Sequence, residues 1–175
     1  MYISMWRIKF NHVQDLNDAR FAASALAEWV GFAIDGPNAI AIEQIQEIIG
    51  WCSGPKLILE VHEASIEQIE TYINILPVNG IECSNQRLNE LKTAFSDLTD
   101  WIVTGEPEEN DSIITHGSTW GNSNHLTRID LAKRSSKDLL EHKPEGFSLD
   151  CEKEIELGKK DLTLWHDLFE DLEIF

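Results

Sequence analysis

Ionisable and polar residues recur at regular places in the short apolar runs of this chain. Lys9 and Asn11 lie in the first such run, and Glu60 and His62 close a later one. If each run is a strand that is buried on both faces, alternation with period two turns these polar side chains to one face. An ammonium, carboxylates and imidazoles gathered on that face could transfer protons or bind a polar ligand.

The elements that would position these residues are eight short runs with strand character. They are residues 7–11, 29–35, 56–62, 80–84, 101–105, 112–116, 127–131 and 146–150. Between the early runs, apolar residues recur at helical spacing, as at Ile42, Ile45 and Ile49. Ser65 and Gln68 have capping-box spacing, and a last helix is expected over residues 161–172. This alternation predicts one α/β domain over residues 1–175, a (β/α)₈ TIM barrel with parallel strands.

The predicted barrel is shortened, because about 200 residues is the usual lower limit for this fold and the chain has 175. Only residues 106–111 separate the fifth and sixth strands, which leaves no room for a covering helix. Residues 117–124, rich in Gly, Ser and Asn, indicate a loop. We therefore expect the helices after strands five and six to be missing or reduced. An open doubly wound sheet of fewer strands is the alternative architecture.

A barrel thinned at this side would uncover the outer faces of strands five and six. Trp101, Val103, Ile113 and Trp120 are the candidates for the exposed surface. Large uncovered apolar patches usually mark interfaces, so a homodimer through this side is one expectation. The alternative is that loops and the C-terminal segment fold over it.

Period-two alternation also predicts which polar residues point into the barrel. The C-terminal ends of barrel strands, where active sites of this fold lie, would carry Asn11, Asp35, His62, Ser84, Thr104, His116 and Asp150. One layer deeper would lie Lys9, Glu60, Glu82 and Asp130. Buried charges are costly unless they are paired. Two interpretations stay open: an ion-pair network around Lys9 that fixes strand register, or the base of a ligand site in which a carboxylate of raised pKa acts as general base.

Metal binding has weak support. His62, His116, Glu60, Glu82 and Asp150 are suitable ligands for several divalent ions, but the sequence has no His-x-His pair and no pair of cysteines. We therefore predict no metal and no cofactor. The odd, widely spaced Cys52, Cys83 and Cys151 indicate reduced thiols, which favours a cytoplasmic protein.

Net charge and hydropathy exclude two further classes of partner, nucleic acids and membranes. A formal net charge of −17 argues against binding to a nucleic-acid backbone, which requires a basic surface. No apolar run approaches the length of a membrane-spanning helix. A small-molecule ligand at the mouth of the barrel is the remaining expectation.

Both ends of the chain carry a family resemblance. Ile8-Lys9-Phe10-Asn11 is followed by Leu16-Asn17-Asp18-Ala19, and Gly31-Phe32 stands in the second run. Near the C-terminus, the stretch from Gly146 to Glu154 precedes Gly158-Lys159-Lys160-Asp161. These stretches resemble the phosphoribosylanthranilate isomerases, whose first strand reads Lys-Ile-Cys-Gly-Ile, followed by Leu-Glu-Asp-Ala. The resemblance is moderate over residues 56–84 and poor over residues 106–145.

The resemblance implies a TIM barrel and an isomerase of tryptophan biosynthesis, acting on a phosphorylated sugar-type substrate by general acid–base catalysis. The family's catalytic Cys falls on Asn11 and its catalytic Asp on His116. The Arg that binds the anthranilate carboxylate falls on Asn38, and the family's Gly after its Cys falls on His12, which we expect in a surface or loop role.

The resemblance also implies that the family's phosphate-binding residues are replaced in this chain. The family's glycines correspond to Ala132-Lys133 and its Ser-Ser-Gly to Asp150-Cys151-Glu152, so only Lys133, Arg134 or Lys153 could compensate. The sequence therefore predicts a degenerate relative without the family's isomerase activity. The alternatives are an active isomerase, a new small-molecule enzyme that uses His62, His116 and Asp150, or an interaction protein.

Overall fold

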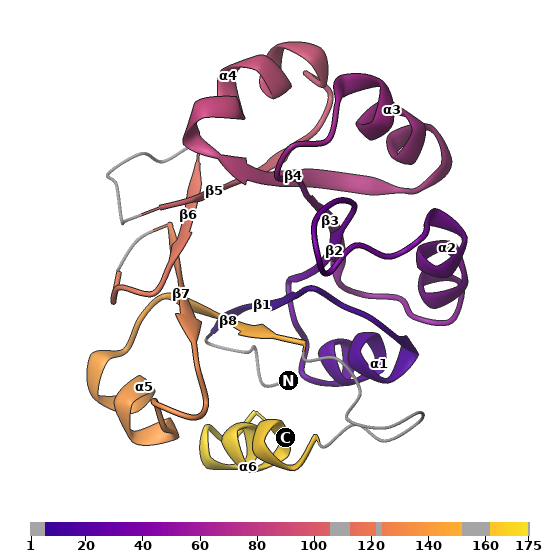
Figure 1. Cartoon of the computed structure of the whole chain (residues 1–175). Coiled ribbons are helices and arrows are strands. Elements are labelled where there is room, and N and C mark those ends of the chain that lie inside the picture. The colour runs from indigo at the N-terminus through magenta and orange to yellow at the C-terminus, as the bar shows by residue number, and fades with distance from the viewer. Residues whose placement is uncertain (1–5, 106–112, 122–123, 152–161, 175) are drawn as a thin grey trace.

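The strands form a closed, all-parallel barrel in which each strand pairs with the next and β8 pairs with β1 (Figure 1). The computed structural model describes residues 6–105, 113–121, 124–151 and 162–174. Its strands are β1 (Arg7–Asn11), β2 (Trp29–Ala33), β3 (Lys56–Glu60), β4 (Val78–Ser84), β5 (Asp100–Thr104), β6 (Ile114–Gly117), β7 (His125–Ile129) and β8 (Gly146–Asp150). The predicted TIM-barrel fold is confirmed, and the open sheet is wrong because Asn11 of β1 pairs with Asp150 of β8.

Six helices lie outside the barrel among the described residues (Figure 1). They are α1 (Leu16–Ser24), α2 (Ile42–Gly50), α3 (Ile66–Ile75), α4 (Asn85–Ala94), α5 (Ser136–His142) and α6 (Thr163–Asp171). Local capping explains where some begin. The Ser65 hydroxyl accepts from the Gln68 N–H at 3.2 Å, as the capping spacing predicts. The helix α5 is not among the elements predicted from the sequence, although Ser135 and Asp138 form a capping box at its start.

No helix follows β5 or β6 within residues 100–105, 113–121 and 124–129, as predicted. The expected exposure is nevertheless wrong for Trp101 and Val103, which are both buried. The Trp101 indole N–H donates to the Leu98 carbonyl, and the Lys92 ammonium lies 5.8 Å from the Trp101 ring. Ile113 and Trp120 are half-buried. A homodimer through this side remains a prediction that now rests on those two residues.

The C-terminal helix covers a different side. The Phe169 ring of α6 lies 6.1 Å from that of Phe10 in β1 and 6.2 Å from that of Phe147 in β8. Phe169, Phe10 and Phe147 are fully buried. The outward faces of β1 and β8 are thus closed by α6, and the apolar core lies between the barrel and its helices.

Inside the barrel, an apolar layer underlies the polar one. Trp29, Ile58, Ile102 and Leu126 pack together there. The seventh strand runs from His125 to Ile129 rather than over residues 127–131. The predicted position of one site residue, Asp130, is therefore wrong. Asp130 lies beyond the end of β7, is exposed, and pairs with the Lys133 ammonium at 2.7 Å instead of pointing into the barrel.

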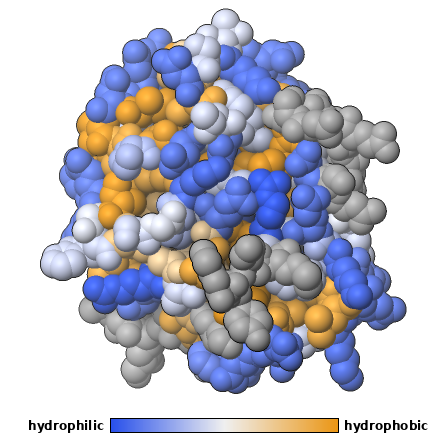
Figure 2. All heavy atoms as spheres, turned by 180° about the vertical axis from the view of Figure 1, so that it is seen from behind, coloured by the Kyte–Doolittle hydropathy of each residue, from blue (hydrophilic) through white to orange (hydrophobic). Residues whose placement is uncertain are grey.

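The outer surface mixes polar and apolar patches. Figure 2 shows a face that is mostly hydrophilic, with hydrophobic patches between the polar groups. Large exposed apolar side chains include Leu26, Trp51 and Leu164. Within the described part of the chain, no helix combines the length and the apolar character needed to span a membrane. All three cysteines are free thiols.

Candidate functional site

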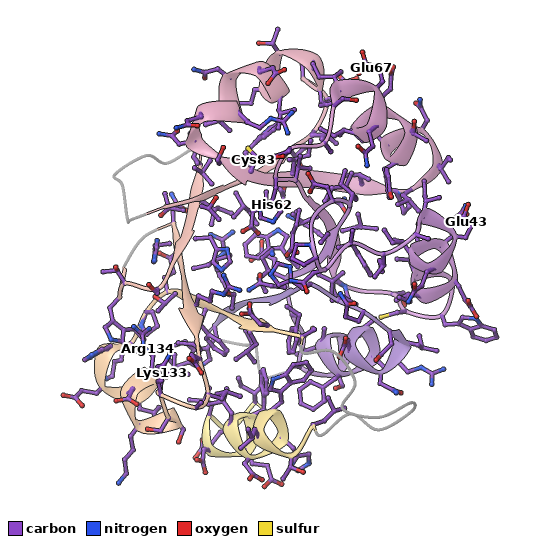
Figure 3. The ribbon with its side chains drawn as sticks, viewed as in Figure 1. Glu43, His62, Glu67, Cys83, Lys133 and Arg134 are labelled. Atoms are coloured by element: carbon purple, nitrogen blue, oxygen red, sulfur yellow. The ribbon has the colours of Figure 1, made fainter. Side chains whose placement is uncertain are left out.

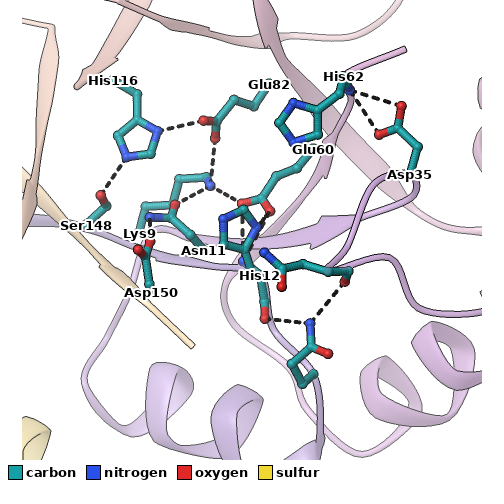
Figure 4. Close-up of polar contacts among 12 residues, drawn as sticks. Lys9, Asn11, His12, Asp35, Glu60, His62, Glu82, His116, Ser148 and Asp150 are labelled. Carbon is teal, nitrogen blue, oxygen red and sulfur yellow. Dashed lines mark hydrogen bonds and ion pairs between the residues drawn. The ribbon is translucent and has the colours of Figure 1, made fainter. Parts of the chain in front are cut away.

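Lys9 is the centre of a buried polar network (Figure 4). Its ammonium lies 2.5 Å from Glu60 Oε1, 2.7 Å from Glu82 Oε2 and 2.6 Å from Asn11 Oδ1. The Lys9 side chain has no exposed surface. Three acceptors match the three donors of an ammonium group. The ion-pair network is therefore present, with Lys9 in contact with both carboxylates.

Mutual charge stabilisation sets the protonation of this network. Burial by itself would lower the pKa of Lys9, but Glu60 and Glu82 raise it above its ordinary value. Burial would likewise raise the pKa of both glutamates, but Lys9 and the neighbouring histidines lower it. Both carboxylates are therefore ionised near neutral pH. The interpretation of a carboxylate with a raised pKa acting as general base is wrong for Glu60 and Glu82.

His116, at the end of β6, is held at both ring nitrogens. Its Nδ1 lies 2.6 Å from Glu82 Oε1, and its Nε2 lies 2.7 Å from the Ser148 hydroxyl. Ser148, His116 and Glu82 thus have the order of contacts of a serine–histidine–acid triad. Ser148 is fully buried, however, and no bound molecule could reach its hydroxyl without rearrangement. These contacts fix the position of His116 rather than activate a nucleophile.

Asn11 connects the Lys9 network to an ion pair at the rim of the barrel. Its amide N–H₂ donates to Asp150 Oδ1 at 2.9 Å, while its oxygen accepts from Lys9. Arg128 of β7 donates to Asp150 through Nε at 2.8 Å and through Nη2 at 2.6 Å. Arg128 is not among the site residues predicted from the sequence. The available signal is its position two residues before Asp130, because both fall on the same face of an alternating strand.

His12 lies in the loop that follows β1, in keeping with the expected surface or loop role. It follows β1 and lines the mouth of the barrel, with its ring Nδ1 2.6 Å from Glu60 Oε2. Its backbone N–H donates to the same oxygen at 3.1 Å. Burial would lower the pKa of His12, but the hydrogen bond and charge of Glu60 raise it. His12 therefore combines its position in this loop with a direct contact to the buried network.

A cavity of about 540 Å³ opens among the C-terminal ends of the strands, and we call it the mouth cavity. Its lining residues are His12, Asp35, Gly36, Pro37, Asn38, Glu60, Val61, His62, Glu63, Glu82, Cys83, Thr104, His116 and Arg128. Pockets of this size hold small organic molecules. The cavity brings together residues of β3 to β7 and of the loops after β1, β2 and β3, and it lies at the face where barrel enzymes bind their substrates.

Predicted mouth residues differ in what they offer to this cavity. Asp35 accepts the backbone N–H groups of His62, Glu63 and Ala64 at 2.9, 2.5 and 2.6 Å, so it fastens the loop after β3. His62 lies beyond the end of β3, is exposed, and lines the mouth cavity. Thr104 is exposed in the lining, and Ser84 is half-buried outside it.

Lys133 and Arg134, two of the residues proposed for phosphate binding, do not line the mouth cavity. Lys133 pairs with Asp130, and the Arg134 guanidinium lies 4.4 Å from the Trp120 ring centre. Figure 3 shows both side chains beside α5, away from His62. Lys153 lies outside the described residues.

The one group of described side chains that could share a metal ion lies outside the mouth cavity. Among the described residues, only the exposed side chains of His166, Asp167 and Glu170 approach one another closely enough to share an ion. All three lie on α6, outside the barrel.

Comparison with known proteins identifies the fold. No protein-family model matches the chain, and no curated protein sequence matches it. The phosphoribosylanthranilate isomerase of Thermus thermophilus matches with a TM-score of 0.71 and 15% identity, covering 95% of this chain and 98% of that chain. The enzyme of Thermotoga maritima gives 0.72 and 13% over 97% and 100%, and that of Pyrococcus furiosus gives 0.64 and 12% over 97% and 100%. At these identities the similarity establishes the fold and not the reaction: the chain has the barrel of the phosphoribosylanthranilate isomerases.

Proposed function

We propose that this chain binds a small molecule in the mouth cavity and does not isomerise phosphoribosylanthranilate. The observation that carries the proposal is Asn11, which ends β1 where the resemblance places the catalytic Cys. An amide has no useful proton affinity near neutral pH, so it cannot act as the base. Both polar atoms of the Asn11 side chain are also engaged, by Lys9 and by Asp150.

The other positions implied by the resemblance support the same proposal. His116 stands in the place of the catalytic Asp, but Glu82 and Ser148 occupy its two ring nitrogens. Asn38 stands where the family's Arg binds the anthranilate carboxylate, and it adds no positive charge to the lining. Neither the acid nor the carboxylate clamp is available in the form that the isomerisation uses.

The charge of the mouth cavity disfavours a phosphorylated substrate. Four carboxylates line it, from Asp35, Glu60, Glu63 and Glu82, against the single guanidinium of Arg128. That guanidinium already binds Asp150, and the Lys9 ammonium is fully enclosed by its own partners. A phosphate dianion would meet net repulsion there. The proposed ligand is therefore polar and carries no phosphate.

Complementation in cells that lack the isomerase tests this proposal. We expect no growth without tryptophan from the unmodified chain, while the Thermus thermophilus isomerase expressed in parallel restores growth. Asn11→Cys should also fail, because a thiol alone does not supply the phosphate site or the carboxylate clamp. Growth supported by the unmodified chain, at protein levels matched by immunoblot, would overturn the proposal.

A further inference from the structure

His12 and Glu60 form a carboxylate–imidazole pair at the edge of the mouth cavity. Both residues line the cavity, and the His12 side chain is 18% exposed. Glu60 Oε2 lies 2.6 Å from His12 Nδ1 and 3.1 Å from the His12 backbone nitrogen. Glu60 is in turn held by an ion pair with the Lys9 ammonium at 2.5 Å, and the Lys9 side chain has no exposed surface.

This contact determines which His12 nitrogen can handle a proton. A carboxylate at Nδ1 favours the tautomer that carries hydrogen there, which leaves a lone pair on Nε2. Among the described residues, none hydrogen-bonds to His12 Nε2. His116 differs, because both of its nitrogens are engaged. His12 is therefore the histidine of the lining that is both oriented by a carboxylate and free to act on a bound molecule.

The backbone conformation of His12 is a second observation that points to a functional site. Its φ of 55° lies in the left-handed region, where glycine is favoured and a side chain costs conformational energy. Glu60 contacts both the ring and the backbone N–H of His12, and so it stabilises this conformation. Strained backbone that is held by its surroundings concentrates at functional sites.

Arg128 supplies an electrophilic group in the same cavity. Its Nε and Nη2 donate to Asp150, and within the described part of the chain Nη1 has no hydrogen-bond partner. A guanidinium N–H can stabilise the negative charge that develops on a carbonyl oxygen. The lining also offers Asn38 and Thr104 as hydrogen-bonding groups. A base and a charge-stabilising donor thus share one cavity with polar walls and an excess of carboxylates.

We propose that His12 is a catalytic acid–base residue, positioned by Glu60, that moves a proton next to the carbonyl of a small, unphosphorylated hydroxycarbonyl compound bound in the mouth cavity. The C–H bond beside the carbonyl breaks and its proton passes to His12 Nε2. The electron pair forms a carbon–carbon double bond, and the carbonyl oxygen becomes an enolate stabilised by Arg128. Return of a proton from His12 to the same carbon restores the carbonyl, so no oxidant or reductant is needed.

Hydrogen–deuterium exchange at carbon tests this step. Dihydroxyacetone, erythrulose and ribulose, none of them phosphorylated, would be incubated with the full chain in D₂O and followed by proton NMR. We expect deuterium beside the carbonyl of at least one compound, faster than in buffer alone. His12→Asn should slow this exchange by about 10²–10⁴-fold, which is the usual contribution of general acid–base catalysis.

Matched variants separate catalysis from folding. Asn tolerates the left-handed backbone of residue 12, and His12→Gly replaces His12→Asn if the latter does not fold by circular dichroism. His166→Asn, on the exposed face of α6, should leave the exchange rate unchanged. Glu60→Gln should shift the pH–rate profile to lower pH, because Glu60 and Asp150 raise the pKa of His12 while burial and Lys9 lower it.

Two results would overturn the inference: no exchange in any of the three compounds, or exchange that persists unchanged in His12→Asn. The inference rests on the proposed use of the mouth cavity as a ligand site, and the experiments separate the two. Isomerisation of phosphoribosylanthranilate would refute the proposed function alone, whereas the exchange experiment judges His12 directly.

Discussion

Single residues in the barrel interior act mainly through the charges that they neutralise. Lys9, which has no exposed surface, pairs with both Glu60 and Glu82. Bringing such charges together in the interior yields little net stability, because each must first lose its hydration. Removing one partner is costly, because the remaining charges stay buried without compensation.

Lys9→Met should therefore lower the free energy of unfolding by about 3–5 kcal/mol. Two ionised carboxylates would face each other across the barrel without the ammonium. Urea denaturation followed by tryptophan fluorescence measures the effect. Lys56→Met is the matched control, because Lys56 pairs with Asp100 at the surface with 45% of its side chain exposed; its cost should stay within about 1 kcal/mol. Equal effects of the two variants would mean that the Lys9 network is not buried as described.

The same carboxylates predict how stability depends on pH. Folding lowers the pKa of Glu60 and Glu82 below the ordinary value of 4.5. Their contribution is therefore present above pH 4.5 and is lost as the pH falls from there through the lower, folded-state values. Glu82→Gln should show a shallower loss of unfolding free energy than the unmodified chain below pH 4.5. Parallel curves in denaturant titrations at successive pH values would contradict this account.

The contribution of His12 to the free energy of unfolding depends on pH in the opposite direction. The pKa of His12 is raised on folding above the ordinary 6.5, so its contribution is present below pH 6.5 and is lost as the pH rises through the folded-state value. The chain should therefore be most stable between the two titrations.

At the scale of elements, β2 leaves space for the Lys9 network because the residue that faces it, Gly31, has no side chain. A Cβ on Gly31 would overlap the Glu60 carboxylate and approach the Lys9 ammonium to 2.7 Å. Gly31→Ala should cost about 1–3 kcal/mol through overpacking, measured by thermal unfolding. Gly50, within α2, has no neighbouring atom within 4 Å of the position that a Cβ would take, so Gly50→Ala should be neutral or slightly stabilising. A neutral Gly31→Ala would show that the ion pair can move aside.

The helix α6 covers the outer face of β1 and β8 and packs against them through a group of aromatic rings. Phe169 contacts Phe10, Phe21 and Phe147 within 6.2 Å between ring centres. Phe169→Ala should destabilise the chain by about 3–5 kcal/mol through loss of buried surface and the cavity left behind. Leu164→Ala, on the same helix with 60% of the side chain exposed, should stay within about 0.5 kcal/mol. Equal unfolding free energies for the two variants would indicate that α6 does not dock as described.

At the scale of the whole molecule, the sequence predicts the barrel because its strands are buried on both faces. Alternation with period two then assigns Lys9, Glu60 and Glu82 to the interior, and short connections identify the side without helices. The pattern is weaker where strands are short. It places the end of β7 too late, which puts Asp130 inside and overlooks Arg128.

Other features depend on contacts that no local pattern contains. The left-handed backbone of His12 accompanies a contact with Glu60, which is remote in sequence. Trp101 is buried, with its indole N–H donating to the Leu98 carbonyl and the Lys92 ammonium of α4 lying 5.8 Å from its ring centre. Spacing alone cannot supply such information.

The molecule as a whole combines the barrel fold of the phosphoribosylanthranilate isomerases with a strongly acidic character. The net charge of −17 and the four carboxylates of the mouth cavity oppose the approach of a phosphorylated anion. The same scaffold can support different chemistry when residues at the strand ends change. The shared fold therefore does not decide the reaction.

Direct measurement of phosphoribosylanthranilate isomerisation by the purified chain is the most decisive test. The Thermotoga maritima isomerase would serve as the positive control under the same conditions. We predict a rate indistinguishable from the uncatalysed background, for the unmodified chain and for Asn11→Cys alike. A kcat/KM for the unmodified chain comparable to that of the control would contradict the account and would require a base other than Asn11 at the end of β1.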